Sequence, residues 1–247
     1  MKKPLHSNRN NANVIYGRIP VKSSIETDKA LKIIVQHNFG DVELLEMARR
    51  KHLPVEYVDI KVLDSMTKNG NHQGVIARVK EYEYSSIDEI IKISKGKKQP
   101  LVVILDEISD PHNLGAIIRS CDAFGVDGII MKSHHQVPIN MTVVKVSTGA
   151  IDHAKIARVS NISNAIKSLQ ESGFWIYAAD GSGKTKYNEV KYDRPTALIV
   201  GSEGEGVSRL VLEHSDFVIQ IPMLGHVNSL NVSVATGILL ANIRSSK

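Results

Sequence analysis

The feature that most constrains the fold is a pair of unbroken apolar runs. Residues 101–105 read Leu-Val-Val-Ile-Leu, and residues 196–200 read Thr-Ala-Leu-Ile-Val. A run of this kind, without alternating polar positions, is typical of a strand buried on both faces of a sheet. Stretches with helical periodicity separate such runs along the chain. The pattern therefore predicts an α/β fold with a mostly parallel sheet and helices on both faces.

The second part of the chain repeats this alternation. Strands are expected at 101–105, 128–131, 155–159, 174–179, 196–200 and 217–221, and helices at 113–124, 162–172 and 231–244. In sheets of this kind, ligands bind beyond the carboxyl ends of the strands. A binding site is expected there.

The first part of the chain predicts a separate, smaller α/β unit. Its expected elements are strands at 32–37, 54–58 and 74–79 and helices at 41–51 and 60–66, with residues 1–12 as a frayed tail. A short helix at 87–93 and the polar run 95–100 precede the apolar run at 101. We therefore expect a domain at 1–80, a linker at 81–100 and a second domain at 101–247.

Composition narrows the function classes. No apolar run is long enough to span a bilayer, and the polar start lacks the apolar segment of a secretory signal, so a cytoplasmic protein without membrane association is expected. The single cysteine, Cys121, excludes an internal disulfide and zinc sites of the Cys-x-x-Cys kind. It falls in an apolar helical pattern and is interpreted as buried. The adjacent His134 and His135 have no third ligand at a recognisable spacing, so a polar loop and no metal are expected.

Charge is unevenly distributed along the chain. Residues 1–100 hold 18 lysines and arginines against 12 aspartates and glutamates, whereas residues 101–247 hold 13 against 14. A positive excess confined to the first part favours an anionic partner for it, nucleic acid being the commonest, although a solvated surface would look similar.

Two glycine-rich stretches resemble nucleotide-binding motifs incompletely. Gly183-Lys184-Thr185 could end a phosphate-binding loop, but the position that requires the first glycine holds Ala178. The stretch 201–206 lacks the dinucleotide-binding spacing, and its two carboxylates would repel a pyrophosphate. Nucleotide binding is therefore the weaker interpretation of both.

Three polar segments each follow a predicted buried strand: residues 106–119, 199–208 and 221–235. Parallel strands bring such segments to one edge of the sheet, which predicts a composite site. These segments resemble the three motifs of the SpoU/TrmH class of RNA 2′-O-ribose methyltransferases. The matching residues are Asp110, Pro111, Asn113, Gly115 and Arg119 in the first, Gly201, Glu203 and Gly206 in the second, and Ile221–Met223 with Ser229–Ala235 in the third.

The resemblance carries implications for fold and partners. It implies a SPOUT domain with a mostly parallel sheet, a deep trefoil knot formed by the last third of the chain, and a homodimer formed through this domain. Residues 14–18 and 72–76 are similar to the family's small L30e-like RNA-binding domain. The implied cofactor is S-adenosyl-L-methionine, held by Gly201, Ile221, Met223 and Leu230, with Thr148, Ala179 and Gly181 as further contacts.

The resemblance also implies catalytic residues, which are Arg119, Asn113, Glu203, Ser229 and Asn231. An arginine is effectively always protonated, so Arg119 is easier to understand as an electrostatic clamp on the ribose hydroxyl than as a general base. An ion pair of purely structural importance between Arg119 and Glu203 is the alternative. Asn231 could also act as a helix cap.

Several substrates fit such a chain. The two-domain organisation is most similar to the RlmB type, which implies methylation of a guanosine ribose in 23S ribosomal RNA. A tRNA guanosine enzyme and a Tsr-like enzyme acting on an rRNA adenosine are alternatives. Two other classes are a non-catalytic RNA-binding protein, which the intact motif residues disfavour, and a nucleotide-dependent enzyme using residues 181–185.

Overall fold

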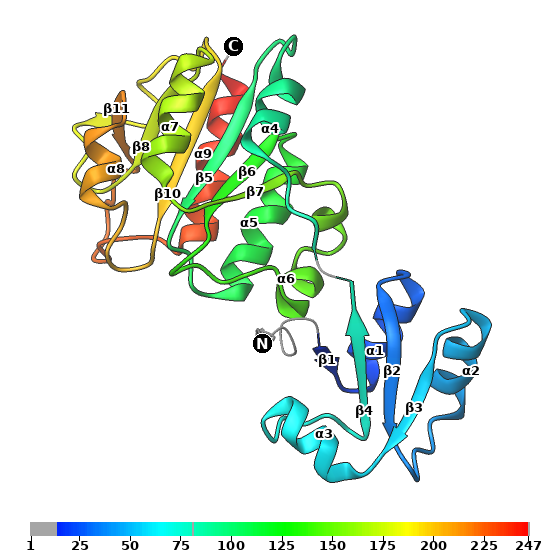
Figure 1. Cartoon of the computed structure of the whole chain (residues 1–247). Helices are drawn as coiled ribbons and strands as arrows, with labels where there is room; N and C mark the ends of the chain where they lie inside the picture. The colour runs from blue at the N-terminus through cyan, green and yellow to red at the C-terminus, as the bar shows by residue number, and fades with distance from the viewer. Residues whose placement is uncertain (1–13, 81, 247) are drawn as a thin grey trace, which may run out of the picture. The chain divides into compact units, whose positions relative to one another are not determined.

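A computed structural model of the chain describes residues 14–80 and 82–246, so the tail expected at 1–12 lies outside the described residues. The chain divides into two compact units, one ending at Tyr82 and the other beginning at Glu83. Figure 1 shows both units, each with a sheet and its own covering helices.

The second unit contains a parallel sheet. Its strands are β5 (Leu101–Asp106), β6 (Gly128–Lys132), β7 (Ile156–Val159), β8 (Trp175–Ala179), β9 (Thr185–Lys186), β10 (Thr196–Gly201) and β11 (Phe217–Gln220). They lie in the order β7-β6-β5-β10-β8-β11-β9, and every adjacent pair is parallel. The two apolar runs became β5 and β10, which pair with each other and are fully buried. The predicted mostly parallel sheet is confirmed.

Helices cover both faces of this sheet (Figure 1). On one face lie α4 (Ile87–Ser94), α7 (Ile162–Glu171) and α8 (Arg209–Glu213), which share one apolar core with the strands. On the other face α5 (Pro111–Ala123) packs against α6 (Met141–Val146), the short 3₁₀ helix η1 (Ala150–Asp152) and α9 (Val232–Ser245). Gly115 permits the α5–α6 contact, because a Cβ there would lie 2.7 Å from Cβ of Val146. This close approach of α5 and α6 explains why residue 115 is a glycine.

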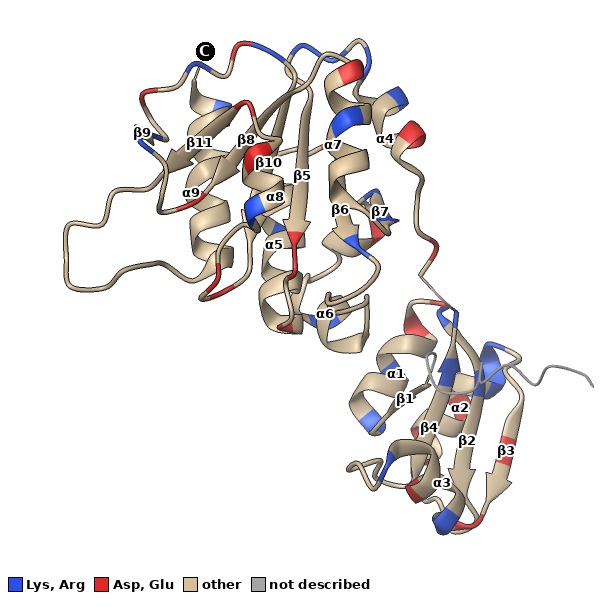
Figure 2. Ribbon diagram, turned by 60° about the vertical axis from the view of Figure 1, so that its left-hand side comes forward, with Lys and Arg blue, Asp and Glu red and all other residues tan. Residues whose placement is uncertain are grey.

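The first unit is a four-stranded sheet in the order β1-β4-β2-β3. Its strands are β1 (Val14–Tyr16), β2 (Ala30–Gln36), β3 (Val55–Val58) and β4 (Val75–Val79), and its helices are α1 (Arg18–Glu26), α2 (Val42–Arg50) and α3 (Ile60–Thr67). Helix α3 packs on one face through Leu63, which joins Ile34 and Ile76 in a buried cluster. Helices α1 and α2 contact each other. Figure 2 shows cations on β2 and β4 as well as on the helices.

The structure differs from expectation in several elements. The short helix expected at 87–93 is present as α4, but it belongs to the second unit and not to a linker, because Ile90 and Ile91 are buried in the core of that unit. A capping box between Ser86 and Glu89 starts this helix. Elements β1, α1, α6, α8 and β9 were not expected. The trefoil knot stays a prediction.

Other expectations concern single residues. Cys121 is buried in α5, as predicted, and burial raises the pKa of its thiol. His134 and His135 lie exposed in a turn. Across residues 14–80 and 82–246, no group of three histidines, cysteines or carboxylates is placed to hold a metal ion. No helix of that part is long and apolar enough to cross a membrane.

Candidate active site

The carboxyl ends of β8, β10 and β11 surround a cavity of about 570 Å³. Three chain segments supply most of its lining: the loop after β8, the loop after β10 and the long connection from β11 into α9. Six of the seven residues expected to hold a cofactor line this cavity, namely Ala179, Gly181, Gly201, Ile221, Met223 and Leu230. Three of the expected catalytic residues, Glu203, Ser229 and Asn231, do so as well. Two of the three segments expected to form a composite site, residues 199–208 and 221–235, therefore line one cavity at this edge of the sheet.

The loop after β10 folds back tightly on itself. Ser202 and Gly206 exchange backbone hydrogen bonds of 3.0 and 3.1 Å. Gly201 has no space for a Cβ, because that atom would overlap the backbone of Gly206. Gly206 in turn has a φ of 72°, a region that favours glycine. Both glycines of the second motif are thus required by the backbone that forms one wall of the cavity.

A hydrogen-bonded cluster joins all three motifs. The amide nitrogen of Asn113 donates to Oε1 of Glu203 at 2.8 Å. The amide nitrogen of Asn231 donates to the same oxygen at 2.7 Å and to Oδ1 of Asn113 at 2.9 Å. Asn113 is buried in the first turn of α5, whereas Glu203 and Asn231 are exposed. One carboxylate oxygen therefore holds two amide groups from distant parts of the chain.

The orientation of Asn231 follows from its second role. Its Oδ1 accepts hydrogen bonds from N and Oγ of Ser233, at 2.9 and 2.6 Å, and caps the start of α9. The amide nitrogen must therefore point the other way, toward Glu203, because a carboxylate can only accept. One side chain therefore forms the expected helix cap and also contacts residues of the other two motifs.

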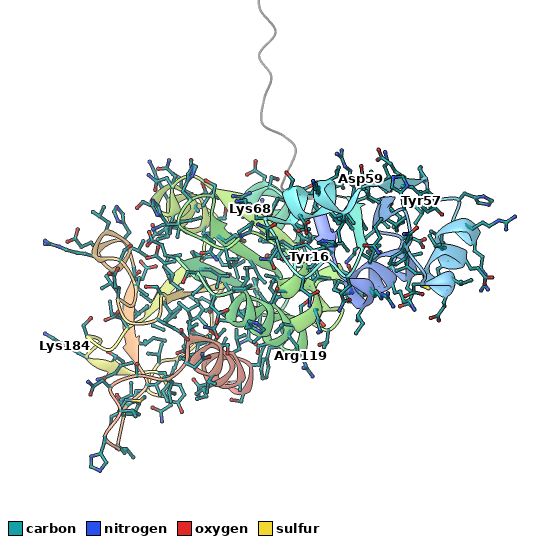
Figure 3. All side chains as sticks on the ribbon, turned by 90° about the horizontal axis from the view of Figure 1, so that it is seen from below. Tyr16, Tyr57, Asp59, Lys68, Arg119 and Lys184 are labelled. Atoms are coloured by element: carbon teal, nitrogen blue, oxygen red, sulfur yellow. The ribbon has the colours of Figure 1, made fainter. Side chains whose placement is uncertain are left out.

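Arg119 lies away from this cluster. It is exposed on α5, and Figure 3 shows its side chain projecting outward at the margin of the structure. It follows Asn113 by six residues, which places it about 9 Å further along the helix and on another side of it. Within the described residues it makes no ion pair, so the structural pair with Glu203 is not formed. Thr148, two residues after the end of α6 and with a φ of 49°, is exposed and does not line the cavity.

Asp180, which the sequence did not single out, couples two walls of the site. It follows β8, and its carboxylate accepts the N–H groups of Ser182 at 2.9 Å and Val207 at 3.2 Å. Burial raises the pKa of Asp180, but the hydrogen bonds from Ser182 and Val207 outweigh this effect and hold the pKa below its ordinary value. The sequence signal that could have identified Asp180 is its position as a polar residue directly after the apolar strand β8.

Asp106 performs a similar role at the end of β5. Only 1% of its surface is exposed. Its Oδ1 lies 2.7 Å from Nζ of Lys132, and its Oδ2 accepts the N–H of Ser208 at 2.8 Å. Burial lowers the pKa of Lys132, but the carboxylates of Asp106 and Glu107 outweigh it and raise the pKa. The Asp106 carboxylate therefore fixes Ser208, just after the second motif, to β5, the strand that precedes the first motif.

The lysine-containing loop at 181–184 leads into strand β9. A phosphate-binding loop leads into a helix, whose N-terminus helps to hold the phosphates. Gly181 lines the cavity described above instead. Nothing in this geometry supports nucleotide binding.

Both parts of the chain match models of known protein families. Residues 100–241 match the model of the SpoU rRNA Methylase family, and residues 14–85 match that of the RNA 2′-O ribose methyltransferase substrate binding domain. The chain is 40% identical over 234 residues to YacO of Bacillus subtilis, with 93% of this chain and 94% of the relative covered. It is 42% identical over 235 residues to a relative from Staphylococcus haemolyticus, with the same coverage. Both are assigned by name to the TrmH family of tRNA/rRNA methyltransferases.

Solved structures are similar over almost the whole chain. An AdoMet-bound rRNA methyltransferase from Sinorhizobium meliloti is 27% identical, with a TM-score of 0.68 and coverage of 94% of this chain and 86% of that one. The SpoU methyltransferase AviRb from Streptomyces viridochromogenes, at 22% identity and a TM-score of 0.69, shares the fold over 96% of this chain and 90% of its own. The family match spans most of the second unit and the relatives cover both units, so the chain belongs to the SpoU/TrmH family of RNA methyltransferases.

Proposed function

We propose that the protein transfers a methyl group from S-adenosyl-L-methionine to the ribose 2′-hydroxyl of a guanosine in large-subunit ribosomal RNA. The observation that carries this proposal is the cluster of Asn113, Glu203 and Asn231 beside the cavity between the strand ends. Fixed polar groups beside a cavity support the proposal that a ribose and a methyl donor meet there.

The cavity fits the cofactor. Its walls combine apolar side chains from Ile221, Met223 and Leu230 with the backbone of glycine-rich loops, and its volume of about 570 Å³ is in the range of small-molecule sites. Gly201 and Gly206 keep that backbone free of side chains. When bound, S-adenosyl-L-methionine supplies an electrophilic methyl group on a sulfonium. The protein must then position a hydroxyl in line with it.

A ribose hydroxyl is a poor nucleophile at neutral pH and needs a group that lowers its pKa or accepts its proton. We propose Arg119 as the cation that stabilises the developing alkoxide, with Asn113 and Glu203 orienting the ribose. Ser229 and Asn231 complete the wall of the cavity. Because Arg119 is always protonated, it acts through its charge.

Arg119 points away from the cavity of its own chain, and this supports a homodimer. Helices α5 and α9 pack together, and α9 exposes half of Val234 and the small residue Ala241. We propose that a second copy docks on this surface. We therefore propose that each site takes its arginine from the partner chain.

The decisive experiment incubates the full chain with tritiated S-adenosyl-L-methionine and unmodified transcripts of 23S rRNA, 16S rRNA and tRNA. Mapping of 2′-O-methyl groups then locates the product. We expect a single guanosine in 23S rRNA. Label in tRNA would show that the substrate is tRNA, and label on an rRNA adenosine would show that the target is an adenosine. Either result would contradict the proposed substrate. Cofactor binding without label in any RNA would indicate a non-catalytic RNA-binding protein.

A matched control tests the site itself. Glu203→Gln keeps the size of the side chain but removes the charge that holds both asparagines, and we expect methyl transfer to fall at least tenfold. Glu213→Gln makes the same chemical change on α8, at a surface ion pair with Arg209. It should leave activity unchanged. Equal activity of both variants would overturn the role of the cluster.

A further inference from the structure

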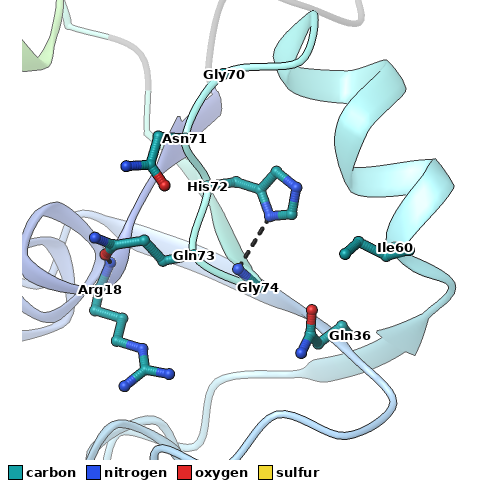
Figure 4. A pocket seen from close by; sticks show the side chains of 8 residues that line it. All are labelled: Arg18, Gln36, Ile60, Gly70, Asn71, His72, Gln73 and Gly74. Carbon is teal, nitrogen blue, oxygen red and sulfur yellow. Dashed lines mark hydrogen bonds between the residues drawn. The ribbon is translucent and has the colours of Figure 1, made fainter.

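The first unit contains a cavity of its own, with a volume of about 560 Å³. It lies at one edge of the four-stranded sheet, where β1, β2 and β3 end and β4 begins. Its lining consists of Arg18, Gln36, Ile60, Gly70, Asn71, His72, Gln73 and Gly74 (Figure 4). The cluster of the candidate active site contributes nothing to it, so it is a separate site with its own chemistry.

Primary amides supply most of the polar groups of this cavity. The side chains of Gln36 and Asn71 make no hydrogen bond within residues 14–80, and Oε1 of Gln73 accepts only the backbone N–H of Arg18 at 2.9 Å. Figure 4 shows Asn71, Gln73 and Arg18 on one side of the loop and Gln36 on the other. An amide offers donors and an acceptor side by side. This is the pattern needed to pair with the edge of a nucleobase.

The loop that carries two of these amides is held in one unusual conformation. Asn69 and Gln73 have φ values of 60° and 51°, which non-glycine residues rarely adopt. His72 is buried beneath them, with Nε2 at 3.0 Å from Oδ1 of Asp64 and Nδ1 accepting the N–H of Gly74 at 3.0 Å. Backbone strain of this kind persists where the surroundings fix it, and it concentrates at binding sites.

The surroundings of the cavity suit a single-stranded RNA. Tyr16 is 40% exposed, and its ring lies so close to Gly70 that a Cβ there would be 2.7 Å from the phenol oxygen. An exposed aromatic ring is a platform on which an unpaired base can stack. Arg18, Lys61 and Lys68 are exposed and, among residues 14–80, make no ion pair. They remain available for phosphates.

We propose that this cavity binds one unstacked nucleobase of the RNA substrate, read by the amides of Asn71 and Gln73. Arg18 contacts the base or the phosphate that follows it. The inference rests on the proposed function, since it takes RNA as the substrate. It adds a residue-level site for sequence recognition in the first unit, far in the chain from the residues that carry the chemistry.

The test uses the full chain and an in vitro transcript of unmodified 23S rRNA. The variant combines Asn71→Ala with Gln73→Gly, because glycine accepts the positive φ of residue 73 while the amide is lost. We expect affinity for the transcript to fall roughly tenfold, the effect of losing one good base contact. The slope of log affinity against log salt should not change, because no phosphate contact is removed. Affinity for an unrelated RNA duplex should stay constant.

A charge-matched pair completes the design. Arg18→Ala should weaken binding of the transcript several-fold more than Arg50→Ala, which removes the same charge from α2. Parental affinity of the amide variant would overturn the proposal, and so would an equal loss on the unrelated duplex. Cofactor binding and methyl transfer by the parent protein are measured in parallel. A parent that neither binds nor methylates any RNA would refute the proposed function, and this inference with it.

Discussion

The two roles of Asn231 can be separated by two substitutions. Asn231→Ala removes both the helix cap and the amide donor. Loss of an N-cap costs about 1 kcal/mol. Loss of the donations to Asn113 and Glu203 adds about 1 kcal/mol, at the lower end for hydrogen bonds because Glu203 is exposed. We therefore expect a loss of roughly 2 kcal/mol, or a midpoint of thermal unfolding about 4–8 °C lower.

Asn231→Asp keeps the cap, because an aspartate oxygen can accept the same bonds from Ser233. It replaces the donor by a carboxylate that faces Oε1 of Glu203, where the amide nitrogen now lies at 2.7 Å. Two charges about 3 Å apart repel by about 1.4 kcal/mol in a water-like dielectric. The repulsion raises the pKa of the introduced carboxyl in the folded state. The folded protein then binds a proton more tightly than the unfolded chain.

The stabilities of the two variants depend on pH in different ways. The destabilisation by Asn231→Asp is full above the raised pKa and shrinks as the pH falls toward about 4, where the carboxyl becomes neutral and can donate to Glu203. The loss caused by Asn231→Ala has no such dependence. Trp175 in β8 is the only tryptophan of the chain, so its fluorescence follows unfolding of the second unit alone.

The assay compares unfolding midpoints of parent and variants at pH 7.5 and 4.5, together with methyl transfer at pH 7.5. Both variants should lose most activity, because Glu203 and Asn113 lose the hydrogen bonds that the amide of Asn231 donates to them. Identical pH dependence of the two variants would refute the reasoning about the carboxylate pair. Near-parental methyl transfer by Asn231→Asp would refute the role of the amide donor.

Four further outcomes are expected. Arg119→Ala should abolish methyl transfer while cofactor affinity, measured by equilibrium dialysis, stays within about tenfold, or roughly 1.4 kcal/mol. Gly201→Ala should abolish cofactor binding in the same assay, because the new Cβ would overlap the backbone of Gly206. Cys121 should react with iodoacetamide only after unfolding, since burial raises the pKa of its thiol and excludes the reagent, and mass spectrometry checks this. Removal of residues 1–80 should preserve cofactor binding and weaken RNA binding in a filter assay.

The sequence predicted the central strands well because their signal is local. Unbroken apolar runs became β5 and β10, and strands placed on their flanks agreed within a few residues. Helix α5 begins at Pro111 after the cap Asp110, two residues before the predicted start, although both residues are ordinary start signals. Helices α6 and α8 were missed because helices of one to two turns depend on packing rather than on their own propensity.

The candidate site was predicted as a set of loops but not as a set of contacts. The strand order brings the loops to one edge of the sheet. Nothing in the local sequence indicates that the amides of Asn113 and Asn231 both donate to one carboxylate oxygen of Glu203. Asp106 and Asp180 belong to none of the three motifs, and their only signal in the sequence is a polar residue directly after an apolar strand. The separation of Arg119 from Asn113 could have been recognised from the helical period, since six residues correspond to one and two-thirds turns.

The cluster of Asn113, Glu203 and Asn231 also determines when the candidate active site can form during folding. Its three members are separated by 90, 28 and 118 residues in the chain. Contacts between such distant residues form late, because long segments must be ordered before they can meet. Asn231 follows all strands of the second sheet along the chain. During synthesis the second unit can therefore assemble most of its sheet while the cluster is still absent, and a nascent or truncated chain that ends before α9 would have no site at all.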